Sequence, residues 1–150
     1  MERQNARGRT RGAVATAVLF SLCAWMPHRA MAQQANENLA GTTWRLTSLT
    51  MADTTVQPDD REKYTLSFDK NGMVVIRADC NSGRGRYMDP SGDLAINKIV
   101  LTRMHCPPGS VADKFARALG FTESYTINDG NLLLGISSTG DTLRFERSSR

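Results

Sequence analysis

The side chains that could carry chemistry gather around Cys80 and Cys106 of this 150-residue sequence. His105 stands beside Cys106 and could act as the base of a Ser-His-Asp triad, but no nucleophile-elbow motif accompanies it. The two cysteines and His105 could ligate zinc, but they lack the usual short ligand spacings and a clear fourth ligand. We therefore expect no catalytic residue, no metal site and no cofactor, and we interpret His105 as a loop histidine.

Polar side chains cluster around the first cysteine, at Asp79, Asn81, Ser82, Arg84 and Arg86. If the cluster is a small recognition site, Asp79, Asn81, Arg84 and Arg86 are its candidate binding residues. The alternative is a structural turn whose Asp and Asn side chains cap backbone donors. The residue types favour the turn and leave the recognition site open.

Seven aromatic residues fall on the inward phase of expected elements: Trp44, Tyr64, Phe68, Tyr87, Phe115, Tyr125 and Phe145. They could line a pocket for a small apolar ligand. Side chains usually fill the interior of a small barrel, however, so a packed core is the favoured interpretation.

Residues 1–32 have the three parts of a secretory signal peptide. Residues 1–12 carry four arginines and one glutamate, residues 13–26 are apolar, and Ala30-Met31-Ala32 is a small-x-small cleavage motif. The apolar run is shorter than the roughly 20 residues that a membrane-spanning helix needs. We expect cleavage between Ala32 and Gln33, a periplasmic or secreted protein, and no stable membrane anchor afterwards; an uncleaved anchor is the alternative.

Cleavage would change the charge of the protein. Residues 1–32 hold five of the 19 basic and one of the 15 acidic residues, so 14 of each would remain and the formal charge would fall from +4 to zero. A nucleic acid or an anionic membrane attracts a basic field, so we expect neither as a partner. Arg84 and Arg86 are flanked by Asp79 and Asp89, as in a solvated face.

Cleavage would also remove Cys23 and leave two cysteines in an exported chain. In an oxidising compartment this pattern indicates one disulfide, Cys80–Cys106. Two free, buried thiols are the alternative.

Strand patterns alternate with turn residues along the rest of the chain. After a polar tether at residues 33–38, strands are expected at residues 44–47, 64–68, 73–77, 85–88, 94–96, 99–102, 125–128, 132–136 and 143–146. Residues 52–62 and 79–83 are expected to be loops, and Asn71-Gly72 predicts a type I′ hairpin turn.

Residues 111–119 change to helical periodicity. Ser110 is expected to cap this helix, with Asp113 completing a capping box and Gly120 ending it. The composition, 40% hydrophobic and 23% charged, excludes wholesale disorder. Eight or nine short strands and one short helix predict a mainly β fold: a small antiparallel β-barrel-like domain spanning residues 39–147.

The chain resembles the META-domain family, the heat-shock HslJ-like proteins of bacterial envelopes. The matching segments are LAGTTWRL at 39–46, YTLSF at 64–68 followed by Asn71-Gly72, CNSGRGRY at 80–87, TRMHCP at 102–107, the helix at 111–119, Ser124-Tyr125 and LRF at 143–145. The family often has glycine at the position of Asp79, and Met-Ala at Met104-His105. The resemblance implies a barrel-like domain of lipocalin-like topology with one helix, no transferable catalytic site, and a link to envelope stress.

These observations favour a non-catalytic, exported, monomeric domain that binds an envelope protein or another surface component. A lipocalin-like carrier of a small apolar ligand is the second hypothesis, and a hydrolase is the third.

Overall fold

The computed structural model describes residues 38–90, 92–136 and 140–149, which belong to one compact unit. The expected signal peptide, its cleavage point and nearly all of the tether lie outside these residues. Within the described ranges, no helix is long and apolar enough to span a membrane.

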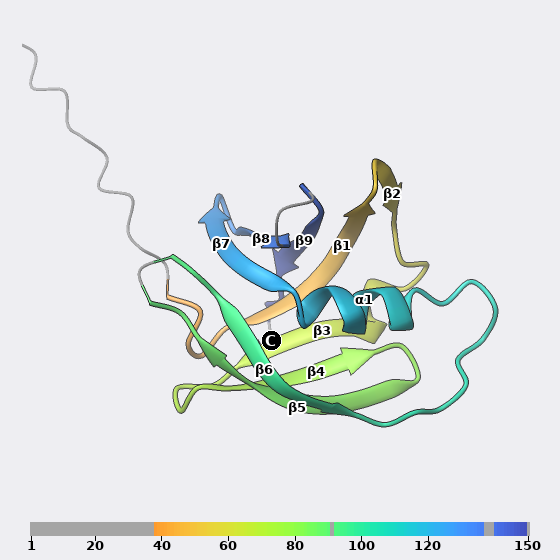
Figure 1. Ribbon diagram of the computed structural model, residues 1–150, viewed down its shortest axis with the longest axis horizontal. Coiled ribbons are helices and arrows are strands. Elements are labelled where there is room, and N and C mark those ends of the chain that lie inside the picture. The colour runs from red at the N-terminus through yellow and green to blue at the C-terminus, as the bar shows by residue number, and fades with distance from the viewer. Residues whose placement is uncertain (1–37, 91, 137–139, 150) are drawn as a thin grey trace, which may run out of the picture. The chain divides into compact units, whose positions relative to one another are not determined.

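The described chain is built mainly from antiparallel strands (Figure 1). A single α-helix, α1 (Ala112–Leu119), and a one-turn 3-10 helix, η1 (Arg61–Lys63), accompany the strands in these ranges. The strands are β1 (Thr43–Met51), β2 (Thr54–Val56), β3 (Tyr64–Phe68), β4 (Met73–Ala78), β5 (Asn81–Met88), β6 (Ala95–Leu101), β7 (Thr122–Asn128), β8 (Asn131–Ile136) and β9 (Thr142–Arg147). The prediction of a mainly β domain with one short helix is confirmed.

The strands form one curled, half-barrel sheet in the order β6-β5-β4-β3-β1-β9-β8-β7, with β2 paired to β1. The edge strands β6 and β7 lie near each other without pairing along their length; an isolated bridge joins Asp93, just before β6, to Ser124 of β7. At this bridge the amide of Leu94 donates to the carbonyl of Glu123 over 2.9 Å. Figure 1 shows α1 beside the remaining opening, between the two halves of the sheet.

Side chains fill the concave side of the sheet. Alternate residues of each strand point inward because successive side chains of a strand lie on opposite faces. Trp44, Phe115 and Phe145 are fully buried at the centre, and the rings of Phe115 and Phe145 lie 6.1 Å apart. The Tyr64 ring meets Phe115 edge-on at 5.9 Å, so α1 packs its apolar face directly onto the sheet. Six of the seven aromatic residues are core residues, and Tyr125 is partly buried against them.

One predicted turn differs from the structure. The β3–β4 loop has only Gly72 at positive φ, so the expected type I′ turn at Asn71-Gly72 is wrong. The carboxylate of Asp69 accepts hydrogen bonds from the amides of Asn71 and Met73, which stabilises a longer loop. The type I′ signature, positive φ at both central residues, occurs instead at Asp129-Gly130 between β7 and β8.

The helix also begins differently from its prediction. The Ser110 amide donates to the carbonyl of Pro107 rather than to Asp113, so the expected capping box is absent and α1 starts at Ala112. The Ser110 hydroxyl accepts from the Ala112 amide and is also bonded to the Tyr64 hydroxyl, 3.1 Å away. This contact joins the start of the helix to β3.

Candidate functional site

The four candidate binding residues from the sequence divide into two groups. Asp79 and Asn81 lie at the tight β4–β5 corner, whereas Arg84 and Arg86 lie further along β5 with exposed side chains. The expected loop over residues 79–83 is wrong, because Ala78 pairs directly with Asn81 and only Asp79 and Cys80 form the turn.

Asp79 has a conformational role. Its φ of 56° lies in the left-handed region that favours glycine, and Asp is among the few other residues that tolerate it. Its amide donates to the carbonyl of Lys63 over 2.7 Å, and its carboxylate lies 3.7 Å from the Lys63 ammonium. An acidic residue therefore fits the conformation of this turn, and the ion pair with Lys63 occupies its carboxylate.

Asn81 and the disulfide together hold the segment that leads into α1. Cys80 and Cys106 are disulfide-bonded, with Cα atoms 5.5 Å apart. The buried Asn81 amide donates to the carbonyl of Met104 over 3.1 Å, and its side-chain oxygen accepts from the Met104 amide over 2.7 Å. The Thr102 hydroxyl donates to the same oxygen over 2.9 Å. Asn81 therefore acts as a structural clamp whose polar atoms already have partners.

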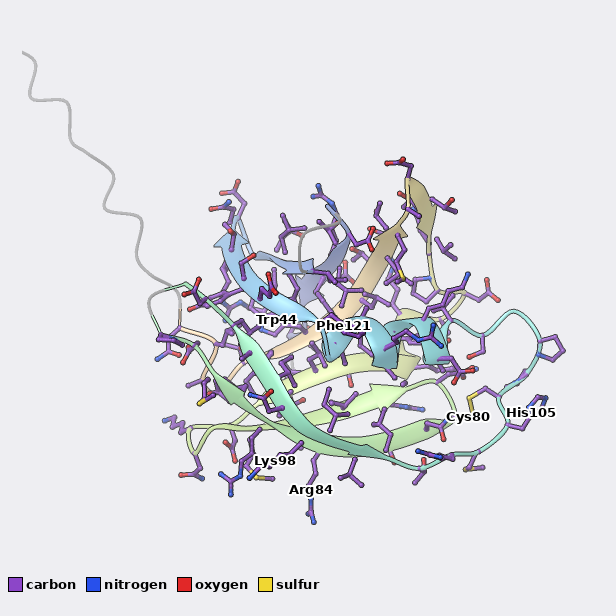
Figure 2. The ribbon with its side chains drawn as sticks, viewed as in Figure 1. Trp44, Cys80, Arg84, Lys98, His105 and Phe121 are labelled. Atoms are coloured by element: carbon purple, nitrogen blue, oxygen red, sulfur yellow. A yellow bond between two sulfur atoms is a disulfide. The ribbon has the colours of Figure 1, made fainter. Side chains whose placement is uncertain are left out.

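Four cations define what we call the cationic face, on the outer side of β4, β5 and β6. They are Arg77, Arg84, Arg86 and Lys98, and all four are exposed. Figure 2 shows Arg84 extending away from the sheet on the same side of the molecule as Lys98. None of these three strands contains an acidic residue, so the positive charge is uninterrupted across them.

Exposed aliphatic side chains lie between the cations. Arg84 is the cross-strand neighbour of Val75 on one side and of Val100 on the other. Val75 is 56% exposed and Val100 is 69% exposed, although both belong to a side-chain type that is normally buried. The outer side of the three strands is thus a mixed apolar and cationic surface.

The acidic residues that flank the two arginines in the sequence do not neutralise them. Asp79 pairs with Lys63, and among the described residues neither Asp79 nor Asp89 forms an ion pair with Arg84 or Arg86. The charge of Asp89 instead contributes to the raised pKa values of two tyrosines. Burial raises the pKa of Tyr87, and the charge of Asp89 raises it further. Burial and Asp89 raise the pKa of Tyr125 in the same way.

Sequence reasoning missed two members of the cationic face. The alternation of β4 could have identified Arg77, which follows the exposed Val75 by two residues on the same face. Lys98 had no such signal, because it sits at positive φ in a bulge opposite β5. The two strands expected at 94–96 and 99–102 are one strand, β6, which continues through the bulge.

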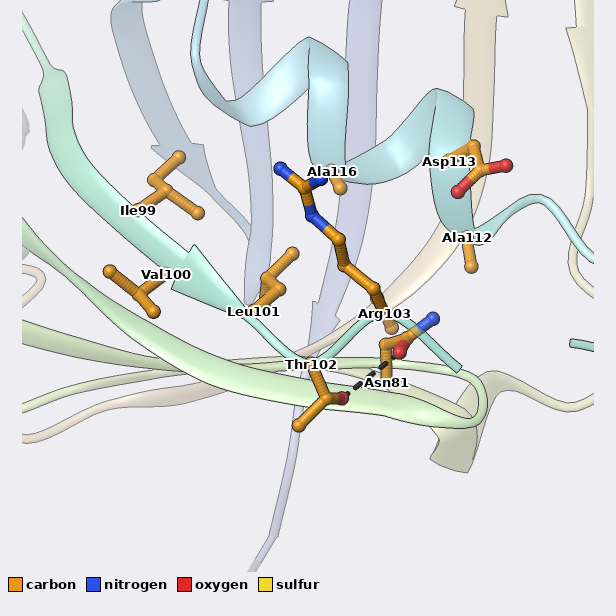
Figure 3. Close-up of a pocket in the computed structure, with 10 residues that line it drawn as sticks. Asn81, Ile99, Val100, Leu101, Thr102, Arg103, Ala112, Asp113 and Ala116 are labelled. Carbon is orange, nitrogen blue, oxygen red and sulfur yellow. Dashed lines mark hydrogen bonds between the residues drawn. The ribbon is translucent and has the colours of Figure 1, made fainter. Parts of the chain in front are cut away.

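A groove of about 500 Å³ lies on the other side of β6, between that strand and α1 (Figure 3). Ile99 and Leu101 contribute its strand wall, and Ala112 and Ala116 contribute its helix wall. Figure 3 shows Arg103 reaching across the groove towards Ala116, with Asp113 at the same helix. Because β6 is the terminal strand of the sheet, no other described strand pairs with its outer edge, and the space between that edge and α1 stays open as the groove.

Two glycines of β5 allow β6 to lie this close. A Cβ on Gly83 would fall 1.9 Å from the carbonyl oxygen of Val100, and one on Gly85 would fall 3.2 Å from that of Asn97. Both distances are shorter than ordinary van der Waals contact, so the sequence Gly83-x-Gly85 fixes the path of the edge strand.

The arrangement around His105 offers no support for a catalytic triad. The imidazole is exposed, and no hydrogen bond in the described ranges joins it to a serine or a carboxylate. The sulfurs of Cys80 and Cys106 are bonded to each other and are not free to ligate zinc. Groups of three or more His, Cys, Asp and Glu side chains suited to a metal ion are absent from the part of the chain that the structure describes.

Comparisons with known proteins agree on the fold. A family model described as the META domain matches residues 37–150. The NMR structure of a protein from Burkholderia xenovorans is 27% identical, with a TM-score of 0.63, over 75% of this chain and 85% of that one. The crystal structure of a DUF4847-family protein from Bacteroides vulgatus is 15% identical, with a TM-score of 0.54, over 76% of this chain and 97% of that one. No curated protein matches the chain.

Proposed function

This chain belongs to the META-domain family, and we propose that it is an exported, non-catalytic binding domain that recognises an acidic protein of the bacterial envelope through the cationic face. Export is supported by the signal-peptide pattern of residues 1–32. The role in envelope stress that the family resemblance implies is part of the same proposal.

The cationic face is the observation that carries this proposal. Protein surfaces normally intersperse both signs of charge, but β4, β5 and β6 expose four cations and contain no acidic residue. A surface of one sign attracts a partner of the opposite sign and speeds its association. Exposed Val75 and Val100 add apolar area that a partner can bury.

The composition of this face favours a protein over a nucleic acid or a lipid surface. Three of its four cations are arginines, whose planar guanidinium binds carboxylates in a bidentate manner. Its strands expose no aromatic ring on which a base could stack or that could enter a lipid interface, since Tyr87 points into the core. The zero net charge expected for the mature chain also favours a protein partner, because nucleic acids and anionic membranes attract proteins with a net positive charge.

Two separate observations speak against the two other hypotheses: the filled interior and the surroundings of His105. A lipocalin-like carrier needs an internal cavity, whereas Trp44, Phe115 and Phe145 occupy the concave side of the sheet. A hydrolase needs a base held beside a nucleophile, and His105 has no such neighbour among the described residues.

Binding to labelled poly-L-glutamate, followed by fluorescence anisotropy, tests the proposal. The protein is produced from the full coding sequence and compared with Arg84→Glu/Arg86→Glu. We expect this variant to lose at least tenfold in affinity. The matched control is Lys114→Glu/Arg144→Glu, which makes the same change in net charge at exposed positions outside the cationic face and should stay within about threefold of wild type.

Three outcomes would overturn the proposal. Equal losses in the two variants would mean that net charge, not this face, governs binding. Tighter binding to duplex DNA or to phosphatidylglycerol vesicles than to poly-L-glutamate would assign a different class of partner. Recovery of the protein from the cytoplasm alone, with residues 1–32 intact, would remove the export step.

A further inference from the structure

The β6 strand has an open edge at the point where the half-barrel fails to close. It is the last strand in the order of the sheet, and its own residues pair with no strand on their far side among the described residues; the bridge to the opposite edge is at Asp93, just before β6 begins. An edge strand presents a row of backbone N–H and C=O groups to which another chain can add as a further strand. The bulge at Lys98 lies between the Asp93 bridge and the open end of β6.

The two sides of this open end differ in chemistry. On the outer side Val100 lies next to Arg84 and belongs to the cationic face. On the inner side Ile99 and Leu101 line the groove under α1, opposite Ala112 and Ala116. One strand therefore separates a surface that favours acidic side chains from a groove of no net charge whose strand and helix walls are apolar.

We propose that a short, extended segment of the acidic partner adds to the edge of β6, with acidic and apolar side chains alternating along it. Successive side chains of a strand point to opposite faces, so an added strand would place one set on the cationic face and the other in the groove. This inference rests on the function proposed above and names the form in which the partner is recognised.

The dimensions of the groove limit the length of the segment. The open end of β6 and the residues that follow it in the groove wall run from Ile99 to Arg103. Five residues of extended chain span roughly 17 Å. The charged groups of the groove, Arg103 and Asp113, carry opposite charges, so the groove has no net charge and can take uncharged side chains against Ile99, Leu101, Ala112 and Ala116. A groove of about 500 Å³ shared among two or three side chains has room for aliphatic residues such as valine.

Four peptides test the inference by anisotropy. The first alternates glutamate and valine over seven residues; the second has the same composition in two blocks. The third and fourth are the alternating peptide with every second amide N-methylated, one in each of the two possible phases. We expect the alternating peptide to bind at least tenfold more tightly than the block peptide. We also expect N-methylation in one phase, but not in the other, to abolish that advantage, because only one set of amides faces the edge of β6.

A groove variant supplies the matching change on the protein. Ala116→Phe projects a ring from α1 into the groove while leaving the cationic face intact, and it should reduce alternating-peptide binding at least tenfold without affecting the block peptide. Circular dichroism checks that the variant folds; if it does not, the N-methylated peptides decide the question alone.

The outcomes separate this inference from the proposed function. If both peptides bind equally and both lose affinity with Arg84→Glu/Arg86→Glu, the cationic face stands and strand addition is refuted. If neither peptide binds and poly-L-glutamate does not bind either, both are refuted. If the protein forms dimers that Ala116→Phe abolishes, the edge of β6 pairs with a second copy, and the partner segment is refuted.

Discussion

Removing the Cys80–Cys106 disulfide should destabilise the domain by about 3.5 kcal/mol. The bond links residues 26 positions apart. Closing a loop of that length removes roughly 12 cal/mol/K of entropy from the unfolded chain, which is about 3.5 kcal/mol at 25 °C. For a domain of this size the loss corresponds to a fall in Tm of about 10–15 °C.

We expect most of this loss to arise in the unfolded state, because other contacts hold the same corner in the folded one. In a Cys80→Ala/Cys106→Ala variant, Asn81 can still bind both backbone groups of Met104 and keep the segment before α1 in place. The native fold should therefore persist, and amide exchange in α1 should increase only modestly. Asn81→Ala should have a larger effect in the variant without the disulfide than in the wild type, because the clamp is then the main link at this corner.

Urea unfolding followed by circular dichroism measures both effects. Dithiothreitol should lower the Tm of the wild-type protein and leave that of the double variant unchanged, which is the internal control. A loss below 1 kcal/mol in the double variant would refute the chain-entropy reasoning. Free thiols at both positions in protein taken from the periplasm would refute the pairing itself.

Four further predictions test the core, the edge strand, the buried tyrosine and export. Trp44→Ala should cost about 3–5 kcal/mol because the indole is fully buried, and a loss under 1 kcal/mol in urea unfolding would contradict that burial. Gly83→Ala should lower the free energy of unfolding by about 1–3 kcal/mol or more, because its Cβ would overlap a backbone carbonyl of β6. Gly135→Ala is the milder control, because its Cβ meets only a serine side chain. Equal Tm values for the two variants would contradict the close approach of β6 to Gly83. The pKa of Tyr87 in the folded state lies above the ordinary value of 10.0, so the tyrosine of the unfolded chain loses its proton first and stability should fall as pH rises past about 10. The fall in Tm between pH 9 and 11 should be smaller in Tyr87→Phe than in the wild type. An identical fall in the two proteins would count against a raised pKa. Mass analysis of the exported protein should find Gln33 at its N-terminus, and an intact leader or a lipid-modified N-terminus would exclude this cleavage.

Strands whose period is uninterrupted were predictable from the sequence. Tyr64, Leu66 and Phe68 are all buried, as their alternation with Thr and Ser indicates, because one face of the sheet meets the core and the other meets solvent. The polar loop expected at residues 52–62 contains β2 and η1 instead, since short, exposed elements carry no apolar period. The β6 bulge at Lys98 interrupts the period in the same way and made one strand look like two.

The candidate surface depends on register, which the sequence does not show. Arg84 and Arg86 could be singled out because they are two residues apart. Arg77 and Lys98 join them only through the pairing of β5 with the strands on either side. Asp79 and Asn81, which the sequence grouped with the arginines, belong to the corner beneath them, because a two-residue turn reverses the chain there. The groove lies between the unpaired edge of β6 and α1, so it depends on how two separate segments pack, and neither segment indicates it alone.

The central position of β1 imposes an order of events on folding. Its longest partnership, from Trp44 to Thr50, is with β9, the final strand, and these two strands hold the middle of the sheet. A chain emerging amino terminus first, from a ribosome or a translocation channel, cannot complete its core until residues 142–147 have emerged. Until then β1 and β8 each lack a neighbour, and the apolar side chains of β1 stay exposed to other chains. We therefore expect the core to form in one cooperative step once β9 is available. Deleting β9 (Thr142–Arg147) should lower stability more than deleting the edge strand β7.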